Sequence, residues 1–308
     1  MENTMDGNLR KIFSKYNPID CITLLYIFLT TLLLIFGTGR YENTAEHYLV
    51  RSGMFIFIWL IVRLEEMFPG RMLRILHQLY PLLFLSYFYP ETCYLHSIFP
   101  GVLDAGIIRL EVALFGFLPS EAFSRCCPQA WFSELMHFGY FSFYLIILFL
   151  VVWYYIKYPL LAGKKVFIFL FSFYIFYLIF IFFPSEGPQY FLPVPEKKVP
   201  AGCFFTGLMQ KILLFDRPTG AFPSSHIGIT WLIMFFFFSD NRKIFCWWLV
   251  PAVLLTFATV YIKAHYVVDV IAGFLMVPPL VWSGNKIYDL FFATHTVPGE
   301  EPAMIETL

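Results

Sequence analysis

Long apolar runs alternate with short polar breaks along most of this chain, and the runs set its architecture. Eight of them have the length and composition of membrane-spanning segments. Helices are expected, because backbone groups in hydrocarbon must find their hydrogen bonds within the segment. We therefore predict eight spans near residues 21–38, 48–64, 72–90, 134–156, 165–184, 223–239, 243–262 and 266–287.

Residues 91–133 break this pattern, because charged side chains such as Asp104, Arg109 and Glu111 recur among apolar ones. We expect an interfacial helical segment near 95–130, the alternative being an extramembrane loop that contains a helix. The predicted fold class is all-α, a polytopic membrane helix bundle in which a six-helix core follows N-terminal helices. The predicted domains are a cytoplasmic N-terminal segment (1–20), one transmembrane domain (21–290) and a disordered cytoplasmic tail (291–308).

Composition supports the membrane assignment. Of 308 residues, 59% are hydrophobic and only 14% are charged, which is more apolar surface than a soluble domain can cover. The net charge of zero gives no support to a nucleic-acid partner. The first twenty residues are polar, so no cleavable signal peptide is expected and the first apolar run is a retained span.

The basic residues give the sidedness. Eight spans place both termini on one side, which then carries twelve of the Lys and Arg residues against nine on the other. This excess predicts cytoplasmic termini. Residues 184–189 and 223–226, together with Lys263 and His265, all fall at the opposite, non-cytoplasmic face. We predict an integral, multi-pass membrane protein with its functional site there.

One of these polar places is the start of a predicted helix. Pro223 suits a first helical turn, and Ser224 and Ser225 supply hydroxyls beside free backbone N–H groups. Such a helix start holds anions, phosphate above all. A capped helix without further function is the alternative, but His226 follows directly and Arg217 precedes it.

A second polar place begins the last predicted span. His265 and Asp269 are four residues apart and share one face of a helix. A carboxylate bonded to one imidazole nitrogen leaves the other free as a nucleophile or base. The alternative is a capping or interfacial polar pair, although an aspartate inside a membrane helix is costly unless it is used. Positive charge for phosphate binding is available from Lys211, Arg217 and Lys263.

These residues resemble the signature of the type 2 phosphatidic acid phosphatase superfamily of membrane phosphohydrolases and phosphotransferases. That signature is Lys-x6-Arg-Pro, then Pro-Ser-x-His, then Ser-Arg-x5-His-x3-Asp. The corresponding residues here are Lys211…Arg217-Pro218, Pro223-Ser224-Ser225-His226 and Ala258-Thr259…His265…Asp269. Lys211 is one residue out of register, and Ala258-Thr259 replaces Ser-Arg, so Lys263 is the candidate to supply the missing charge.

With these departures, the chain resembles the branch of the superfamily that includes inositolphosphorylceramide synthases and many bacterial lipid phosphatases. The segments that carry this likeness include 183–188, 222–226 and 263–273, within a motif core of 183–275. The resemblance implies a six-helix phosphatase-like core and two chemical steps. In the first, His265, oriented by Asp269, attacks phosphorus and forms a phosphohistidine, while His226 protonates the leaving alkoxide. No metal or cofactor is implied.

The resemblance leaves the acceptor open. Water would make the protein a lipid phosphatase, whereas a lipid or sugar hydroxyl would make it a transferase such as an inositolphosphorylceramide synthase. Under this reading Arg217, Lys263, Lys211, Ser224 and Ser225 hold the phosphate, and the expected partner is a membrane lipid that bears a phosphate ester. Residues that could line a head-group or acceptor pocket, or alternatively only pack inside the bundle, are His137, Glu134 and Glu186.

A further expectation, a disulfide, depends on which side of the membrane the cysteines face. Cys203 falls on the non-cytoplasmic side with Cys126 and Cys127, which predicts a disulfide between Cys203 and one of that pair.

A non-catalytic head-group transporter is the alternative function. Binding an anionic head group would need only cationic side chains, however, and not a histidine with a carboxylate beside it. A scaffold role would leave the polar cluster unexplained.

Overall fold

Helices make up all the regular secondary structure in the computed structural model, which describes residues 16–37, 44–99, 101–194, 198–214 and 216–292. The predicted all-α class is confirmed. Each predicted span coincides with one of eight long helices: α2 (Pro18–Phe36), α3 (Thr44–Met67), α4 (Arg71–Leu95), α7 (Ala130–Lys157), α8 (Pro159–Phe182), α11 (Ser225–Asp240), α12 (Arg242–Tyr261) and α13 (Val267–Phe292).

Six helices among the described residues are long and apolar enough to cross a membrane, namely α2, α3, α7, α8, α12 and α13. The chain is an integral membrane protein. Helix α11 is apolar but has 16 residues, which is short for a full crossing. The predicted terminal segments are described only from residue 16 and up to residue 292, so their assignment stays a prediction.

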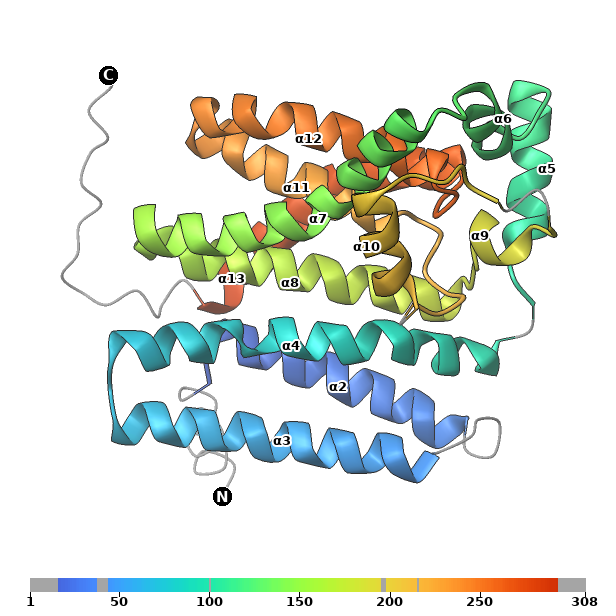
Figure 1. The fold of residues 1–308 in the computed structure, drawn as a ribbon. Coiled ribbons are helices and arrows are strands. Elements are labelled where there is room, and N and C mark those ends of the chain that lie inside the picture. Colours follow the sequence, from blue (N-terminus) through green and yellow to red (C-terminus); the bar gives the residue numbers. More distant parts are fainter. Residues whose placement is uncertain (1–15, 38–43, 100, 195–197, 215, 293–308) are drawn as a thin grey trace.

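The long helices form two layers. Helices α2, α3 and α4 lie together on one side of the molecule, and α2 and α4 pack on α8 (Figure 1). On the other side of α8, helix α7 packs along α12, and α11 packs against α8, α12 and α13. The N-terminal layer therefore rests on the remaining helices through α8.

Helices α11 and α13 approach each other closely where both begin their course through the bundle. A Cβ atom on Gly273 would lie 2.5 Å from the carbonyl oxygen of Ser224, so only glycine fits at that point. A Cβ atom on Gly228 would likewise meet the Phe176 ring. The contact between Gly273 and Ser224 brings the start of α11 against α13.

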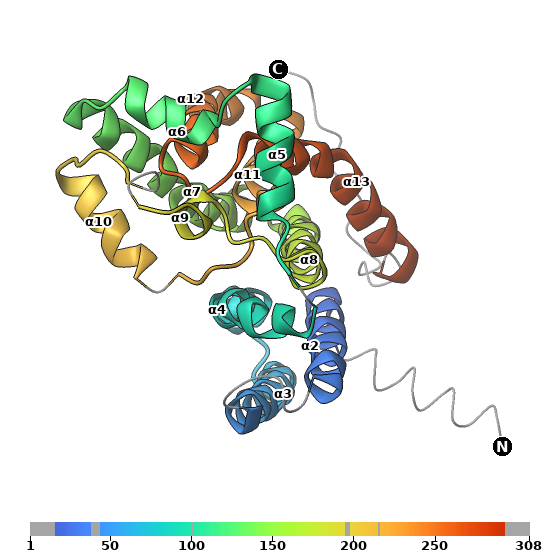
Figure 2. The same ribbon diagram turned by 90° about the vertical axis from the view of Figure 1, so that its right-hand side faces the viewer.

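Short helices gather at one end of the bundle, which faces the viewer in Figure 2. The helical segment predicted near 95–130 is confirmed and is divided into three pieces. Among the described residues, the short helices at this end are η1 (His96–Ile98), α5 (Asp104–Phe115), α6 (Pro119–Cys126), α9 (Pro188–Phe191) and α10 (Phe204–Leu213). They cover the end at which α11 and α13 start.

Candidate active site

Two histidines from distant parts of the chain meet at this covered end. His226 lies in the first turn of α11, and His265 lies in the segment between α12 and α13. Nδ1 of His226 is 3.1 Å from Nε2 of His265. The two polar places singled out in the sequence therefore lie next to each other at this end of the bundle.

The hydrogen bonds of His265 define its tautomer. Its Nδ1 is 2.8 Å from the carbonyl oxygen of Ala221, and because a carbonyl can only accept, Nδ1 carries the proton. Nε2 therefore holds a lone pair, and the hydrogen bond to it is donated by Nδ1–H of His226. The pair consists of an unprotonated nitrogen facing a donor.

The expected hydrogen bond between His265 and Asp269 is not formed. Asp269 Oδ2 is 3.7 Å from Nδ1 of His265 and instead accepts the backbone N–H of Tyr266 at 2.8 Å. The Ala221 carbonyl has taken the position next to Nδ1. Asp269 acts on His265 by holding the backbone amide of the residue that follows it.

Burial decides the charge state of His265, whose side chain is 3% exposed. Desolvation lowers the pKa of the His265 imidazole to about 4, although the hydrogen bond to Ala221 and the negative charge of Asp216 act in the opposite direction. The imidazole is neutral at pH 7. A neutral ring with a free Nε2 is the form in which histidine acts as a nucleophile or base.

Two carboxylates from α5 fix the segments on both sides of His265. Asp104, which is fully buried, accepts the backbone N–H groups of Glu186 and Gly187, each at 2.8 Å, and the Tyr266 hydroxyl at 3.2 Å. Glu111 accepts the N–H of Val268 at 3.1 Å, in the first turn of α13. Helix α5 therefore positions the backbone around the histidine pair.

Gly187 is required for this arrangement. Its φ of 86° is in the left-handed region, and a Cβ atom there would lie 2.7 Å from the carbonyl oxygen of Ala264. The segment before α9 can approach the residue preceding His265 only because Gly187 has no side chain. Neither Asp104 nor Glu111 was among the predicted site residues, although an acidic residue in an apolar segment is a signal of such a role.

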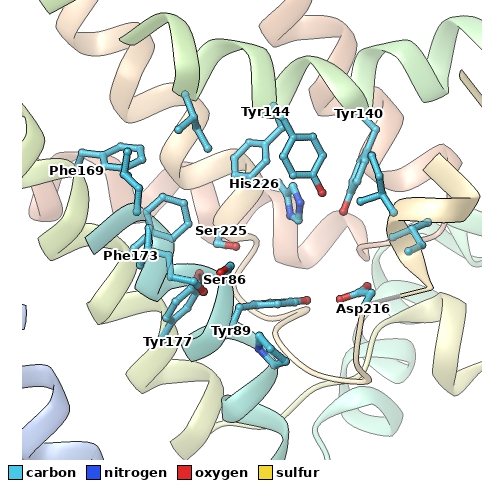
Figure 3. A pocket seen from close by; sticks show the side chains of 17 residues that line it. Ser86, Tyr89, Tyr140, Tyr144, Phe169, Phe173, Tyr177, Asp216, Ser225 and His226 are labelled. Carbon is cyan, nitrogen blue, oxygen red and sulfur yellow. Dashed lines mark hydrogen bonds between the residues drawn. The ribbon is translucent and has the colours of Figure 1, made fainter. Parts of the chain in front are cut away.

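An apolar cavity of about 390 Å³ opens at His226 (Figure 3). Most of its lining comes from hydrophobic side chains of α4, α7 and α8. Its polar end is formed by Ser225, His226 and Asp216 with the hydroxyl-bearing side chains Tyr89, Tyr140 and Tyr144. A cavity of this kind accommodates a hydrocarbon chain that carries a polar group at one end.

Asp216 is the acidic group of this cavity. Its carboxylate accepts a hydrogen bond from Gln189 Nε2 at 3.2 Å, and burial raises the pKa of the carboxyl group above its ordinary value. Asp216 was not among the predicted site residues, although it directly precedes the predicted Arg217. The carboxylate makes this cavity a better environment for hydroxyl groups than for phosphate.

The three predicted cations have different surroundings. Arg217 is exposed and lines a separate, polar cavity beside α3 and α4, while Lys211 is exposed on α10. Lys263 is buried, and its ammonium group donates to the carbonyl oxygen of Lys198 at 2.8 Å. The predicted serines are at the start of α11, where Ser224 caps the helix by accepting the N–H of Ile227 and Ser225 lines the apolar cavity.

Glu134 and His137, predicted as candidates for an acceptor pocket, hold α10 against α7. The Glu134 carboxylate accepts the N–H groups of Phe205 at 2.8 Å and Thr206 at 3.0 Å, and also that of Cys203. His137 Nδ1 is 3.3 Å from the hydroxyl of Thr206 in α10 and 2.7 Å from the carbonyl oxygen of Ser133 in its own helix. Neither side chain lines the cavity that contains His226.

The remaining predictions concern Glu186 and the cysteines. Glu186 is half-buried, its backbone N–H donates to Asp104, and burial raises the pKa of its carboxyl group. The predicted disulfide is wrong, because Cys126, Cys127 and Cys203 are all free thiols. Local contacts hold their segments instead: Glu134 accepts the Cys203 amide, and the Cys127 carbonyl accepts the Tyr261 hydroxyl.

Comparison with known proteins gives one positive finding. The family model of the PAP2 superfamily matches residues 105–278, more than half of the chain. Neither the curated proteins nor the solved structures give a significant match. The matched range contains both histidines, α5 except its first residue, α6 to α12 and the first part of α13, but it leaves out the N-terminal layer.

Proposed function

The chain belongs to the PAP2 superfamily, and from this premise we propose that it is a membrane-embedded lipid phosphohydrolase or phosphotransferase that acts through a phosphohistidine. The superfamily gives the general class, a phosphatase-type function on lipids. The observation that carries the proposal is the 3.1 Å contact between Nδ1 of His226 and Nε2 of His265. It pairs a free imidazole nitrogen with a proton donor.

In the first step the phosphoryl group replaces the hydrogen bond between the two imidazoles. Nε2 of His265 attacks phosphorus, and the bond from phosphorus to the leaving alcohol oxygen breaks. His226, protonated on both ring nitrogens once the anionic phosphate is bound, gives its Nδ1 proton to that oxygen and is left as the neutral imidazole. The Ala221 carbonyl and the Asp269 carboxylate stabilise the positive charge that develops on His265.

In the second step an acceptor hydroxyl gives its proton to His226 and attacks phosphorus. The phosphorus–nitrogen bond then breaks, and His265 returns to its neutral form. The charged phosphoryl oxygens need donors during both steps. Arg217, Ser225 and the first amides of α11 are the candidates, whereas Lys263 would have to leave the Lys198 carbonyl to take part.

The polar end of the apolar cavity favours an alcohol as acceptor. Asp216 and the hydroxyl groups of Tyr89 and Tyr140 can position a lipid hydroxyl beside His226 (Figure 3). Head-group transfer, as in inositolphosphorylceramide synthases, is therefore the second candidate. Asp216→Asn should lower transfer to a long-chain alcohol by about ten- to a hundredfold while hydrolysis changes less, as one hydrogen bond to a charged group contributes about 1.5–3 kcal/mol. Equal loss of both activities would exclude this role.

The decisive experiment is turnover of labelled lipid phosphate esters by the purified full-length protein. His265→Ala should reduce turnover by at least about a thousandfold and abolish an acid-labile phosphoenzyme. His226→Ala should slow both formation and decay of that intermediate. His96→Ala changes a histidine of η1 that contacts neither His226 nor His265 and serves as the control. Wild-type turnover in His265→Ala would refute the mechanism, and head-group transport without turnover would favour the transporter alternative.

The orientation in the membrane is also a proposal. The excess of basic residues places the termini in the cytoplasm and the histidine pair at the opposite face. Cysteines introduced at exposed positions of α6 should then react with an impermeant thiol reagent added outside cells. Reaction only after permeabilisation would reverse the orientation without affecting the chemistry.

A further inference from the structure

His226 differs from His265 in how its ring is held. Nδ1 of His265 donates to the carbonyl oxygen of Ala221 at 2.8 Å, and that carbonyl also stabilises a positive charge on the ring. Within the residues that the structure describes, His226 has one hydrogen bond, from its Nδ1 to Nε2 of His265 at 3.1 Å, and its own Nε2 has none. The proposed first step nevertheless requires this second nitrogen to carry a proton. Another feature of the site must therefore stabilise the charged ring.

Two aromatic rings of α7 lie against the His226 imidazole. The centroid of the Tyr140 ring is 4.7 Å from that of the imidazole, with 33° between the planes (Figure 3). The corresponding values for the Phe143 ring are 4.4 Å and 46°. Both separations are within the roughly 6 Å at which the face of an aromatic ring attracts a cation. Since these two residues are three positions apart, one side of α7 carries both rings.

The packing of the bundle fixes both rings in place. The side chains of Tyr140 and Phe143 are buried. Tyr140 belongs to a hydrophobic cluster with Met136 and Tyr261, whereas Phe143 belongs to the central core. Side chains in such close-packed surroundings keep one conformation. The rings therefore form a surface that is already in position before a substrate binds to His226.

Among the described residues, the other titratable groups around His226 make no ion pair with it. Asp216, from the connection between α10 and α11, lines the same cavity without a hydrogen bond to His226. Asp269 is on the far side of His265, 3.7 Å from its Nδ1, and the Lys263 ammonium group donates to a backbone carbonyl. The remaining groups are the phenols of the cavity wall, from α4, α7 and α8, namely Tyr89, Tyr140, Tyr144 and Tyr177.

We propose that Tyr140 and Phe143 are positioning residues for the proton donor of the reaction. Their rings hold His226 toward His265 and stabilise the doubly protonated form of His226. This inference rests on the proposed function, in which that form gives a proton to the leaving alcohol oxygen. An apolar cavity wall disfavours a charged imidazole, and the negative faces of the two rings offset part of that cost.

Aromatic faces suit a group that gains and loses a proton in each reaction cycle. A buried carboxylate bonded to His226 would hold the proton more strongly and make the imidazolium a weaker acid. The ring faces attract the charge without accepting the proton in a hydrogen bond. His226 can therefore be charged when the phosphate is bound and still release its proton to the alcohol oxygen.

The test replaces Phe143 of the full-length protein by phenylalanine that carries one, two or three ring fluorines. Fluorine withdraws electron density from the ring face with little change in size, so the attraction for a cation falls stepwise. The readout is the pH dependence of kcat for a labelled lipid phosphate, whose alkaline limb reports loss of the second proton of His226. This limb should move to lower pH with each fluorine, by about one unit over the series, while the maximal rate changes by less than about threefold.

Ordinary substitutions give an independent check. Phe143→Leu and Tyr140→Leu each remove one ring and should move the alkaline limb to lower pH by about half a unit to one unit. Tyr140→Phe keeps the ring and should keep the position of the limb, whatever the hydroxyl contributes to the rate. The matched control is Phe149→Leu, which removes a ring of α7 that stacks on Trp153 at 5.6 Å and does not line the cavity of His226. It should leave the limb in place.

Two results would overturn the proposal. One is an alkaline limb that stays in place through the fluorine series, which remains decisive if the leucine variants fail to fold. The other is an equal shift of the limb in Tyr140→Phe and Tyr140→Leu.

Absence of turnover by the wild-type protein would instead refute the proposed function. The ring contact is then measured by NMR titration of the histidine-labelled protein in detergent, with the His226 signal assigned by its loss in His226→Asn. Fluorination of Phe143 should again lower the pH at which His226 takes up its second proton. An unchanged titration midpoint would show that the rings do not stabilise the charge.

Discussion

Asp104 offers a sharp test of how the catalytic end is held, because it touches no part of the proposed reaction. Its two oxygens accept the amides of Glu186 and Gly187 and the hydroxyl of Tyr266, the residue that follows His265. The substitution Asp104→Asn keeps the size of the side chain. It replaces one acceptor oxygen with an NH2 group that faces a backbone donor.

The expected cost follows from these contacts. One charge-assisted hydrogen bond is lost and one buried N–H is left without an acceptor, which together should lower the free energy of unfolding by about 2 to 4 kcal/mol. The segment before α9 is then free to shift relative to His265. A misplacement of about 1 Å can cost about a hundredfold in rate, so kcat should fall by about ten- to a hundredfold while KM changes little.

The matched control is Asp20→Asn, at the start of α2 in the N-terminal layer. Asp20 is also fully buried, and it accepts hydrogen bonds from Asn17 and Tyr80, both at 2.9 Å. Both variants should lower the thermal unfolding midpoint, and only Asp104→Asn should lower kcat. If the two variants lose stability equally and Asp104→Asn keeps its kcat, the positioning argument fails.

Three further outcomes can be measured in the same assays. Folding holds His265 neutral with a pKa of about 4, whereas the unfolded chain takes up a proton below about 6.5, so stability rises with pH in this window. Acidification from pH 7 to 5 should therefore destabilise the wild type by up to about 2 kcal/mol more than His265→Asn, and equal pH slopes would contradict the burial argument. Glu134→Gln should lower the unfolding midpoint with kcat within threefold of wild type, and a large fall in kcat would instead favour an acceptor site there. Gly273→Ala should cost about 1–3 kcal/mol by pressing on the Ser224 carbonyl, whereas Gly53→Ala, with open space around it, should be tolerated in unfolding assays.

The fold was largely predictable because hydrocarbon leaves the backbone few choices. Every long apolar run became a helix, and the polar segment near 95–130 became several short ones. The exact lengths were less predictable. Helix α11 ends at Asp240 after 16 residues, because Asn241 leaves the helical conformation and caps the start of α12.

That His226 and His265 lie at the same end of the bundle was also predictable, because consecutive antiparallel helices bring the start of α11 and the start of α13 to one end. Their hydrogen bonds were not. The partner of Nδ1 in His265 is a backbone carbonyl, and any residue at position 221 would supply that oxygen, so the sequence carries no signal for it. The spacing of His265 and Asp269 suggested a direct bond, yet α13 begins at Val267 and the carboxylate turns back to the Tyr266 amide.

The cavities that the side chains of Asp216 and Arg217 line could not be predicted from the local sequence. Both residues belong to the short connection between α10 and α11, and their side chains line different cavities. Helix α4 contacts the residues that follow them, through hydrogen bonds from Tyr89 and Thr92 to Thr219. Helix α4 lies outside the matched superfamily region, so the N-terminal layer takes part in shaping the active-site loop. A truncated protein that lacks this layer would therefore lose the support of the loop that carries Arg217, even though both histidines would be present.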